Sequence, residues 1–475
     1  MQCIKTRFSP SPSGFLHLGS IRTALYAWLF AKKQGGKFIL RIDDTNFSRS
    51  NKEAILNIMK SLQWLRLYWD EGPFFQSKRF DRYNDVLNNM LRDGYVYKCY
   101  CSQERLNILR SKQILNKEKP RYDGYCRFNL RNKINVSGNS PFVVRFCNPI
   151  QGKTIFYDLI RGFIEFDNQE LDDFIIKRSD GSWTYNFCSV VDDIDMNISH
   201  VFRGDEHINN TPKQINVFKS LNAKIPEYVH LSMVLDSNKR KLSKRHNSTS
   251  VMEYFRKGFL PDALLNYLVR LGWSYKDMEI FNVEDMVKLF NVHFLNKSSG
   301  MLNAKKLLWL NAYYIRHLPL DIVYKYYKKY IVSRRKFWYF QDISKLLQLI
   351  SVFRSRCSTF QDMEKNFRYF YQDFKEIDSV LVEKYLLNVQ SCKVLKIVRD
   401  AIISLHSWTL EEIGAVLGNI SKKFNFEIST LYMPIRVALM SVSCSPQLSM
   451  VMYILGKEKS LERINRAIKI QDLGI

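Results

Sequence analysis

Residues 7–20, RFSPSPSGFLHLGS, join a proline-rich loop to a histidine and a glycine where a helical pattern begins. The first turn of a helix presents free backbone N–H groups and a partial positive charge, so it attracts anions. Gly19 lets a ligand approach the backbone, and His17 can donate a hydrogen bond to an anion. Pro10 and Pro12 restrict the loop and reduce the entropy lost on binding. The stretch predicts a nucleotide-phosphate site, with an ordinary proline-rich turn and a capping histidine as the alternative.

A second stretch, KRKLSKRH at residues 239–246, is dense in positive charge. Lysines on a loop, such as Lys241 and Lys244, can close over a triphosphate and neutralise charge that develops in a transition state. A basic loop that faces only solvent is the alternative. Together with the first stretch, this one predicts a nucleotide site built from two distant segments.

These residues need elements that bring them together, and the flanking sequence predicts such elements. CIKTRF is typical of a strand, apolar residues follow at helical spacing from Ile21, and Gly35-Gly36 precedes a second strand, KFILRI. A strand–helix–strand unit of this kind predicts a parallel sheet with right-handed crossovers. The predicted fold class is therefore α/β, with a doubly wound, Rossmann-like parallel sheet.

Further along the chain the pattern changes twice. Residues 91–189 carry short strands such as FVVRF and FIEFD, which indicate an α+β insertion. Within it, the turn Asp180-Gly181 before SWTYNF predicts a hairpin. The segment VVDDIDMNISHVFRGDEHI then predicts a return to the main sheet, and amphipathic helical runs dominate from about residue 250.

The whole chain of 475 residues carries a net charge of +26. This excess predicts a polyanionic partner, either a nucleic acid or an acidic membrane, although compositional drift accounts for part of it. The N-terminus lacks the apolar core of a secretion signal, and the uncharged residues 437–456 predict two buried elements around a turn, not a membrane span. Nine cysteines, an odd number, fit a reducing cytoplasm better than a disulfide framework.

The spacings Pro-Ser-Pro-x-Gly-x-x-His-x-Gly and Lys-Leu-Ser-Lys-Arg resemble the two signature motifs of the class I aminoacyl-tRNA synthetases. In the second motif, Leu242 and Arg245 are the variants usual in the glutamate branch. Further segments extend the likeness to the end of the chain: RTALYAWLFAKKQGGKFILRIDDTN, LDDFIIKRSDGSWTYNFCSVVDDIDM, HVFRGDEHINNTPKQI, LLNYLVRLGW, LLWLNAYYI and SLERINRAI. The chain is similar to the bacterial glutamate–tRNA ligase family.

This resemblance implies a two-step reaction with ATP, accompanied by Mg²⁺. L-Glutamate and ATP form glutamyl-adenylate and pyrophosphate, and the glutamyl group then passes to the 3′ end of tRNA. The substrate's own carboxylate is the nucleophile, so alignment and electrostatic stabilisation supply the catalysis. The implied catalytic residues are His17, Lys241 and Lys244. The implied ATP site comprises Pro10, Gly14, His17, Gly19, Ser20, Glu206, Lys241, Leu242, Ser243, Lys244 and Arg245.

A glutamate pocket needs basic donors for carboxylates and an acid for the amine, and arginine meets a carboxylate bidentately. The glutamate contacts implied by the resemblance are Arg7, Ser11, Asp43, Tyr185 and Arg203. Arg7 and Arg203 match the carboxylate-binding arginines, and Asp43 matches the acid for the amine. An ion pair of either arginine with a neighbouring acid, such as Asp205 or Glu206, is the alternative.

The acidic segment departs from the family pattern. Bacterial members usually show Arg-Ile-Glu-Asp-Thr-Asp, and this chain has Arg-Ile-Asp-Asp-Thr-Asn at residues 41–46. Asp43 is one methylene shorter than glutamate, so it contacts the amine directly or through water. The variant also resembles the glutamine branch, which leaves a glutaminyl enzyme as an alternative. Asp192 and Asp193 are interpreted as residues that anchor the fold.

The cysteines of the insertion raise the question of a metal. In a strand, Cys99 and Cys101 of YKCYCS would face the same side, and Cys126 follows. Some relatives bind structural zinc through three such cysteines and a histidine two residues after the last, where this chain has Phe128. Cys147 or Asp123 are candidates for a fourth ligand. Three buried thiols without a metal are the alternative.

The resemblance also implies a division into parts. These are a catalytic domain at 1–90 and 190–250, an inserted acceptor-end-binding domain at 91–189, a helical stem-contact domain at 251–320 and an all-helical anticodon-binding region of two subdomains at 321–475. The stretch YKYYKKYIVSRRKFWYF, residues 324–340, alternates basic and aromatic side chains, which suits phosphate contacts and base stacking. A helix with a solvated basic face is the alternative. Arg356 is a candidate base contact, and the implied protein is a cytoplasmic monomer that binds tRNA.

Three other functions fit parts of the pattern. A truncated paralogue that glutamylates a modified tRNA base would lack the long helical region present here. A glutaminyl enzyme is the second alternative. The third is an RNA-binding protein that kept the fold and lost its activity, against which His17, Gly19, Lys241 and Lys244 argue.

Overall fold

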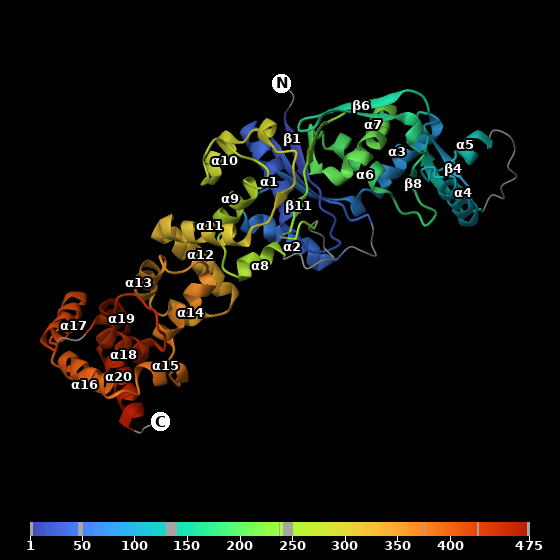
Figure 1. Ribbon diagram of the computed structural model, residues 1–475. Coiled ribbons are helices and arrows are strands. Elements are labelled where there is room, and N and C mark those ends of the chain that lie inside the picture. Colours follow the sequence, from blue (N-terminus) through green and yellow to red (C-terminus); the bar gives the residue numbers. More distant parts are fainter. Residues whose placement is uncertain are drawn as a thin grey trace. The chain divides into compact units, whose positions relative to one another are not determined.

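The computed structural model describes residues 3–45, 51–129, 140–236, 238–240, 250–374, 376–424 and 427–472. The chain divides into two compact units (Figure 1). The first comprises Met1–Phe255 and Pro261–Leu307, and the second comprises Arg256–Leu260 and Leu308–Ile475. All strands of the described chain belong to the first unit.

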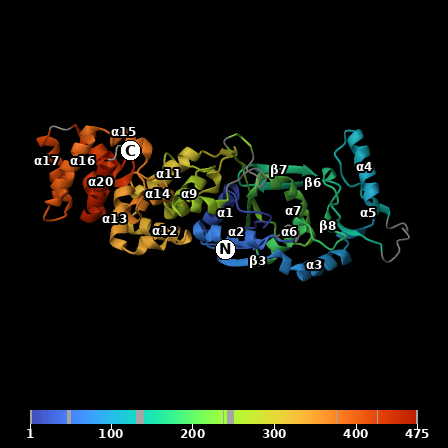
Figure 2. The same ribbon diagram turned by 90° about the horizontal axis from the view of Figure 1, so that it is seen from below.

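A seven-stranded sheet forms the centre of the first unit. Its strands are, in spatial order, β3 (Glu71–Phe75), β2 (Lys37–Ile42), β1 (Lys5–Phe8), β9 (His200–Gly204), β10 (Glu227–Leu231), β6 (Lys153–Asp158) and β7 (Gly162–Asp167). Every neighbouring pair is parallel except β6 and β7, which form an antiparallel hairpin at one edge. Figure 2 shows the two hairpin strands side by side.

Successive side chains of a strand point to opposite faces, so the central strands present apolar residues on both faces of the sheet. Helices cover both of these faces. On β9, Phe202 packs its ring against Phe30 of α1 (Leu18–Lys33). The preceding residue, Val201, packs on the other face with Ile215 of α7 (Thr211–Ser220). The predicted doubly wound α/β fold is therefore confirmed. The strand order reverses between β1 and β9, and ligands of such sheets bind at the carboxyl ends of the strands at this point.

The predicted strand–helix–strand unit is present as β1, α1 and β2. Helix α1 ends at Lys33, and Gly35 follows with a φ of +62°, a conformation that favours glycine. A side chain on Gly36 would meet the carbonyl oxygen of Ile4 at 2.2 Å. The glycine pair thus stops the helix and lets the chain pass close to the start of the sheet.

The range predicted as an insertion builds two structures. Strands β4 (Val96–Cys99), β5 (Val143–Phe146) and β8 (Ile175–Lys177) form a separate antiparallel sheet, flanked by α4 (Gln103–Leu115) and α5 (Tyr125–Asn129). The hairpin of β6 and β7 comes from the same range but joins the main sheet through β10. The insertion is thus tied to the central sheet by its own strands.

The hairpin predicted at Asp180-Gly181 is confirmed but short, because it ends at Thr184, whose N–H donates to Ile176 O at 2.9 Å. The turn at Asp180-Gly181 leads to a single antiparallel bridge between Lys177 and Trp183. From Tyr185 the chain forms helix α6 (Tyr185–Asp195). Its buried residues Phe187, Val190 and Val191 recur at three- and four-residue spacing, so a helix buries them together.

The remaining elements of the first unit complete its faces and connections. They are α2 (Lys52–Trp64), α3 (Phe80–Arg92), α8 (Val251–Arg256), α9 (Pro261–Val269), α10 (Val283–Leu289), β11 (Val234–Leu235), β12 (Gly300–Met301) and the 3₁₀ helix η4 (Asp205–Asn210). Helix α1 packs against α9 and α10 as well as the sheet, which buries it on most sides.

The described part of the second unit is helical, as predicted. Its helices are α11 (Ala304–His317), which begins in the first unit, α12 (Leu320–Ser333), α13 (Ile343–Phe353), α14 (Phe360–Tyr371), α15 (Ser379–Tyr385), α16 (Val389–Ile403), α17 (Leu410–Lys423), α18 (Ile428–Met440), α19 (Leu448–Leu455) and α20 (Lys457–Asp472). The uncharged residues 437–456 cover the end of α18, a turn and α19, which confirms two buried elements around a turn. None of the described helices has both the length and the apolar character needed to cross a membrane.

The basic and aromatic stretch at residues 324–340 divides its side chains between core and solvent. Tyr327 and Tyr330 of α12 are buried and pack against Phe360 of α14. Base stacking by these two tyrosines, expected from the sequence, is therefore wrong, because the helical period turns them into the core. The lysines of the same helix, Lys325, Lys328 and Lys329, are exposed.

Candidate active site

A cavity of about 490 Å³ opens at the carboxyl ends of β1, β2, β9 and β10. It lies where the strand order reverses, the place at which doubly wound sheets bind ligands. Its walls contain ten of the residues singled out in the sequence: Arg7, Pro10, Ser11, His17, Gly19, Ser20, Asp43, Tyr185, Arg203 and Glu206. Gly14 is not among the lining residues. Residues 241–245, with both signature lysines, lie outside the described residues.

His17 occupies the N-cap of α1 and lines the cavity. Its Nδ1 accepts a hydrogen bond from the backbone N–H of Ser20 at 3.3 Å. A neutral imidazole that accepts at Nδ1 carries its proton on Nε2, and that nitrogen lies 3.1 Å from the hydroxyl oxygen of Ser20. The first turn of α1 has no acidic side chain to offset the positive helix end. His17 therefore caps the helix with one ring nitrogen and contacts the Ser20 hydroxyl with the other, beside an anion-attracting helix terminus.

Gly19 lies directly under this imidazole. A Cβ at this position would stand 3.1 Å from His17 Nδ1 and 3.8 Å from Cβ of Val234. Such a contact at 3.1 Å would push the imidazole aside. The glycine thus leaves space for the ring of His17 as well as for a ligand.

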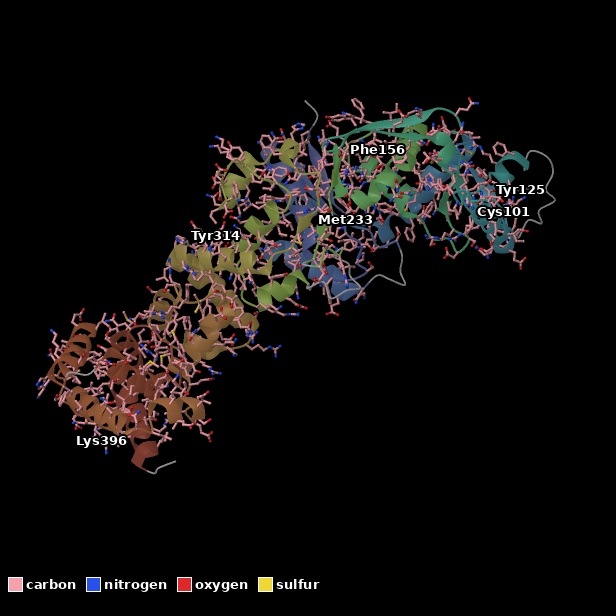
Figure 3. All side chains as sticks on the ribbon, viewed as in Figure 1. Cys101, Tyr125, Phe156, Met233, Tyr314 and Lys396 are labelled. Carbon is pink, nitrogen blue, oxygen red and sulfur yellow. The ribbon has the colours of Figure 1, made fainter. Side chains whose placement is uncertain are left out.

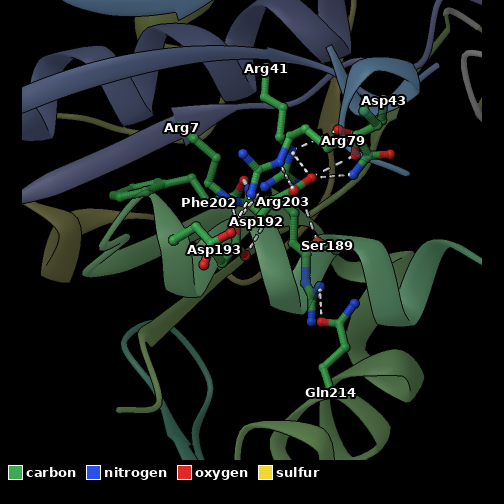
Figure 4. A network of polar contacts seen from close by, with 12 residues as sticks. Arg7, Arg41, Asp43, Arg79, Ser189, Asp192, Asp193, Phe202, Arg203 and Gln214 are labelled. Atoms are coloured by element: carbon green, nitrogen blue, oxygen red, sulfur yellow. Dashed lines mark hydrogen bonds and ion pairs between the residues drawn. The ribbon is translucent and has the colours of Figure 1, made fainter. Parts of the chain in front are cut away.

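Arg7 on β1, which lines the cavity, and Arg41 on β2 share one carboxylate (Figure 4). Arg7 Nε lies 3.2 Å from Asp193 Oδ1, and Arg41 Nη1 lies 2.7 Å from the same oxygen. Burial would raise the pKa of Asp193, but the two arginines outweigh it and hold that pKa below its usual value. Asp193 anchors the site, as the sequence analysis expected. The ion-pair alternative for Arg7 is correct in kind, but its partner is Asp193.

Asp43 lies at the end of β2 and contacts Arg41 Nε at 2.8 Å. Its backbone N–H donates to the carbonyl oxygen of Pro10 at 3.1 Å, which links the proline-rich loop to β2. Burial raises the pKa of Asp43 to about 6, although Arg41 opposes the shift and Asp192 adds to it. The pocket thus holds an acid that is easily protonated, at the position predicted to meet an amine.

Asp192 lies in a buried polar cluster next to the cavity, whose wall includes its partner Gln76. Its carboxylate accepts hydrogen bonds from Gln76 Nε2 at 2.7 Å, Arg79 Nε at 2.7 Å and Tyr83 Oη at 3.0 Å. The side chain has no exposed surface. These bonds tie α6 to α3, which confirms an anchoring role.

Arg203 on β9 is held by three polar groups. Its Nε donates to His230 Nε2 at 3.1 Å, its Nη1 to Gln214 Oε1 at 2.7 Å and its Nη2 to Thr211 Oγ1 at 2.7 Å. The neighbouring acid Asp205 is instead paired with Arg161 at 2.8 Å. Arg203 thus has fixed geometry and lines the cavity without a carboxylate partner among these contacts.

The comparisons with known proteins agree with this geometry. The family described as "tRNA synthetases class I (E and Q), catalytic domain" matches residues 3–309, and the family described as "Anticodon binding domain" matches residues 323–468. The chain belongs to the class I tRNA synthetases of the E and Q group.

Individual relatives of this synthetase cover nearly its full length. A protein named glutamate–tRNA ligase from Blochmanniella floridana is 48% identical, over 98% of each chain. A glutamate tRNA ligase from Elizabethkingia meningosepticum, solved in complex with its amino acid, superimposes with a TM-score of 0.85 at 28% identity, covering 98% of this chain and 99% of that one. The glutamate–tRNA synthetase of Elizabethkingia anophelis gives a TM-score of 0.82 at 28% identity, covering 98% and 100%.

Several residues that line the synthetase cavity were not predicted from the sequence. They are Thr45, Gln76, His207, Ser232, Met233 and Val234, together with Arg22 and Thr23 of α1. Residues 232–234 directly follow the buried strand β10, and carboxyl ends of parallel strands share one edge, so this signal was readable. His207 follows β9 in the same way, and burial near Arg203 lowers its pKa to about 4.

The cysteine cluster lies in the insertion, in a different part of the first unit from the cavity: Figure 3 labels Cys101 there and Met233 at the cavity wall. The sulfur atoms of Cys99, Cys101 and Cys126 all lie within 4.8 Å of one another, and two of them, those of Cys101 and Cys126, are 3.5 Å apart. Tetrahedral zinc, about 2.3 Å from each thiolate, separates such sulfurs by roughly 3.8 Å. The three thiols therefore fit the spacing of a zinc site.

The candidates named for a fourth ligand do not join this cluster. Cys147 and Asp123 are not in the group of donor atoms that lie within 4.8 Å of one another, and Asp123 is paired with Arg105 at 2.5 Å. Phe128, at the place of the relatives' histidine, offers no donor atom. Tyr122 was not considered in the sequence, yet its Oη lies 3.4 Å from Cys99 Sγ and 3.6 Å from Cys101 Sγ. An oxygen at the fourth corner of a zinc tetrahedron stands roughly 3.5 Å from each sulfur. Tyr122 therefore meets the spacing of a fourth ligand.

Proposed function

We propose that this synthetase attaches L-glutamate to the 3′ end of its tRNA, with ATP as the energy source. A carboxylate oxygen of glutamate attacks the α-phosphorus of ATP, the bond to the β-phosphate breaks, and pyrophosphate leaves. A ribose hydroxyl of the terminal tRNA adenosine then attacks the acyl carbon, and AMP leaves. The observation that carries the proposal is one cavity in which a helix N-terminus and a charged amino-acid pocket meet.

The helix end would hold the nucleotide. His17, together with the Ser20 hydroxyl that it contacts and the first turn of α1, would supply donors for the ATP phosphates, which Mg²⁺ accompanies. Pro10, Gly19, Ser20 and Glu206 line the cavity and would surround this nucleotide, and the resemblance adds Gly14. Lys241 and Lys244, with Leu242, Ser243 and Arg245, would bring cationic charge to the phosphates during transfer, when negative charge builds up.

The basic and acidic walls would hold glutamate. Arg7 and Arg203 present guanidinium groups to its carboxylates, and Asp43 presents a carboxylate to its ammonium group. Ser11 and Tyr185 line the same region and add hydroxyl groups. An uncharged amide, as in glutamine, would leave one arginine without an anionic partner, which favours glutamate over glutamine.

The test is aminoacylation of total tRNA with labelled glutamate or labelled glutamine in the presence of ATP. Only glutamate should become attached. The variant Lys244→Ala should form glutamyl-adenylate ~100-fold more slowly, since it removes transition-state charge stabilisation. Lys239→Ala, in the same basic stretch, is the matched control and should change the rate by less than about threefold. Attachment of glutamine, or equal rates in both variants, would contradict the proposal.

We further propose that the second unit reads the anticodon. Its support is the match of residues 323–468 to an anticodon-binding family and the exposed lysines of α12. Residues 91–189 would bind the acceptor end and residues 251–320 the stem, with Arg356 as a candidate base contact. The enzyme would act as a monomer in the cytoplasm, where charged tRNA is consumed.

We also propose structural zinc at Cys99, Cys101 and Cys126, with Tyr122 as the fourth ligand. The spacing of these four donor atoms supports it, and the metal would join β4 to α5. Metal analysis of the purified protein should find about one zinc, and Tyr122→Phe should lower that content where the exposed neighbour Tyr125→Phe does not. Less than about a tenth of an equivalent in the unaltered protein would remove the site.

A further inference from the structure

A histidine that none of the proposed roles uses lies directly behind Arg203. His230 is on β10, and its side chain has no exposed surface. On one side it contacts Asp158 at the end of β6, whose side chain is equally inaccessible. On the other side it contacts Arg203 on β9. A buried polar chain thus crosses three neighbouring strands and ends at the cavity wall.

Asp158 determines which nitrogen of His230 carries the proton. Its Oδ1 accepts from the backbone N–H groups of Ile160 at 2.9 Å and Arg161 at 2.8 Å. Its Oδ2 accepts from the backbone N–H of His230 at 2.9 Å and lies 2.8 Å from the ring Nδ1. A carboxylate with these four contacts is an acceptor, so the proton sits on Nδ1. Burial would raise the pKa of Asp158, but these bonds outweigh it and lower that pKa.

The far nitrogen of the ring is then a fixed acceptor. Nε2 of His230 lies 3.1 Å from Arg203 Nε, which can only donate. Burial lowers the pKa of His230, and Arg203 adds to this effect while Asp158 opposes it. The imidazole is therefore neutral. An imidazolium would present a second donor to the cationic guanidinium and lose the bond.

The guanidinium is held on all three of its nitrogens. His230 takes Nε–H, and Gln214 and Thr211 of α7 each accept one N–H from a terminal nitrogen. Each terminal nitrogen has one further N–H that these bonds do not use. Because Arg203 lines the cavity, these N–H groups form the fork that can meet a carboxylate.

We infer that His230 is a positioning residue: oriented by Asp158, its Nε2 holds the Nε edge of Arg203 so that the guanidinium fork faces a carboxylate of the substrate. The inference rests on the proposed role of Arg203 in binding glutamate. A strictly structural histidine would affect folding and all substrates alike. A positioning histidine acts on glutamate binding alone, because no other proposed substrate contact depends on Arg203.

Two matched variants test this inference. In His230→Asn, the amide reaches the place of Nδ1 but offers nothing at the place of Nε2. In His230→Gln, the side-chain oxygen reaches the place of Nε2 and can accept from Arg203. We expect His230→Asn to raise the KM for glutamate by about 10-fold or more, because a misplaced contact of 1 Å can cost up to about 100-fold. His230→Gln should stay within about threefold of the unaltered enzyme.

The KM for ATP should change by less than about twofold in both variants, because the proposed role of Arg203 is to bind glutamate and not ATP. His200→Asn is the control for burial: His200 lies on β9, is 7% exposed and contacts Ser199 instead of Arg203. Equal glutamate KM values for His230→Asn and His230→Gln would overturn the inference, as would a matching rise in His200→Asn. If Arg203→Lys raises the glutamate KM and His230→Asn does not, the inference about His230 is wrong while the proposed function still holds. If the unaltered enzyme attaches no glutamate, the proposed function fails instead.

Discussion

Several side chains at the cavity are both charged and buried, and a buried charge is stable only when it is paired with an opposite charge. Arg7, Arg41 and Asp193 are 5% exposed or less, so each depends on its partner for the energy of its charge. This mutual dependence fixes Arg7 before any substrate arrives. Asp43 is the carboxyl group of this network that is most easily protonated, because burial and the neighbouring Asp192 raise its pKa and Arg41 only partly offsets them.

The ionisation of Asp43 should therefore control glutamate use in weak acid. Its pKa of about 6 means that the carboxyl group gains a proton below that pH and no longer attracts an ammonium group. We expect kcat/KM for glutamate to fall as pH drops through about 6, measured by steady-state aminoacylation. In Asp43→Asn, kcat/KM should be about 10- to 100-fold lower at neutral pH and should not fall further in that window.

Folding stability distinguishes this effect from simple acid unfolding. The folded pKa of Asp43 lies above the ordinary 3.8, so the folded state binds this proton more readily than the unfolded state. Asp43 therefore adds stability as pH falls from about 6 toward 4, and the contribution is lost as pH rises through 6. A fall in kcat/KM that persists unchanged in Asp43→Asn would contradict the assignment.

Single elements present these side chains to the cavity. Helix α1 follows β1 after a short loop, and its N-terminus, capped by His17, ends at the cavity. The helix is buried along most of its length, so its position is set by packing and not by its polar end. The carboxyl ends of the parallel strands supply the opposite wall.

A substitution of Gly19, in the first turn of α1, should affect ATP binding much more than folding stability. Gly19→Ala should change the free energy of unfolding by less than about 1 kcal/mol, measured by urea unfolding, because the gain in helix propensity is offset by the disturbed cap of His17. The same methyl group stands 3.1 Å from His17 Nδ1 and should raise the KM for ATP by about 10-fold through displacement of the imidazole.

Gly414→Ala is the matched control, because Gly414 lies inside α17 with no atom within 4 Å of a new Cβ. It should stabilise the protein by up to about 1 kcal/mol through helix propensity and leave the KM for ATP unchanged. If Gly19→Ala leaves the ATP KM unchanged, the arrangement of His17 over the helix end does not contribute to nucleotide binding.

At the scale of the whole molecule, a net charge of +26 has consequences beyond any one contact. Positive charge on the surface attracts a polyanion over several ångströms and releases its counterions on binding. In the second unit, α12 turns its tyrosines inward and leaves Lys325, Lys328 and Lys329 exposed. The helix thus provides charge for phosphates, while its aromatic rings stabilise the unit.

Affinity for tRNA should accordingly fall steeply with salt. In filter-binding or fluorescence titrations, log Kd should rise linearly with log salt concentration, by roughly 0.7 to 0.9 per phosphate contact. Replacing Lys325, Lys328 and Lys329 by glutamine should reduce that slope by up to about 2 to 3 and leave the KM for ATP unchanged. A response independent of salt would contradict phosphate binding by this surface.

The amino-acid sequence by itself determined the local features of this protein. The parallel unit of β1, α1 and β2, the glycine pair that ends α1 and the loop that opens the nucleotide site all follow from propensities and spacings within about 20 residues. The family likeness likewise depends on short motifs. These features can be predicted from the sequence because they depend on residues that are close together along the chain.

The pairing of distant side chains was decided only by the tertiary structure. Arg7 and Asp193 are 186 positions apart, and His230 and Asp158 are 72 apart, so strand order and helix placement bring them together. Tyr122 contacts the cysteine cluster from an irregular segment between α4 and α5, where no periodic pattern in the sequence indicates the contact. The helix at Tyr185 formed because its apolar side chains had a core to enter. Burial and electrostatic pairing act through space, so their outcome depends on the whole fold.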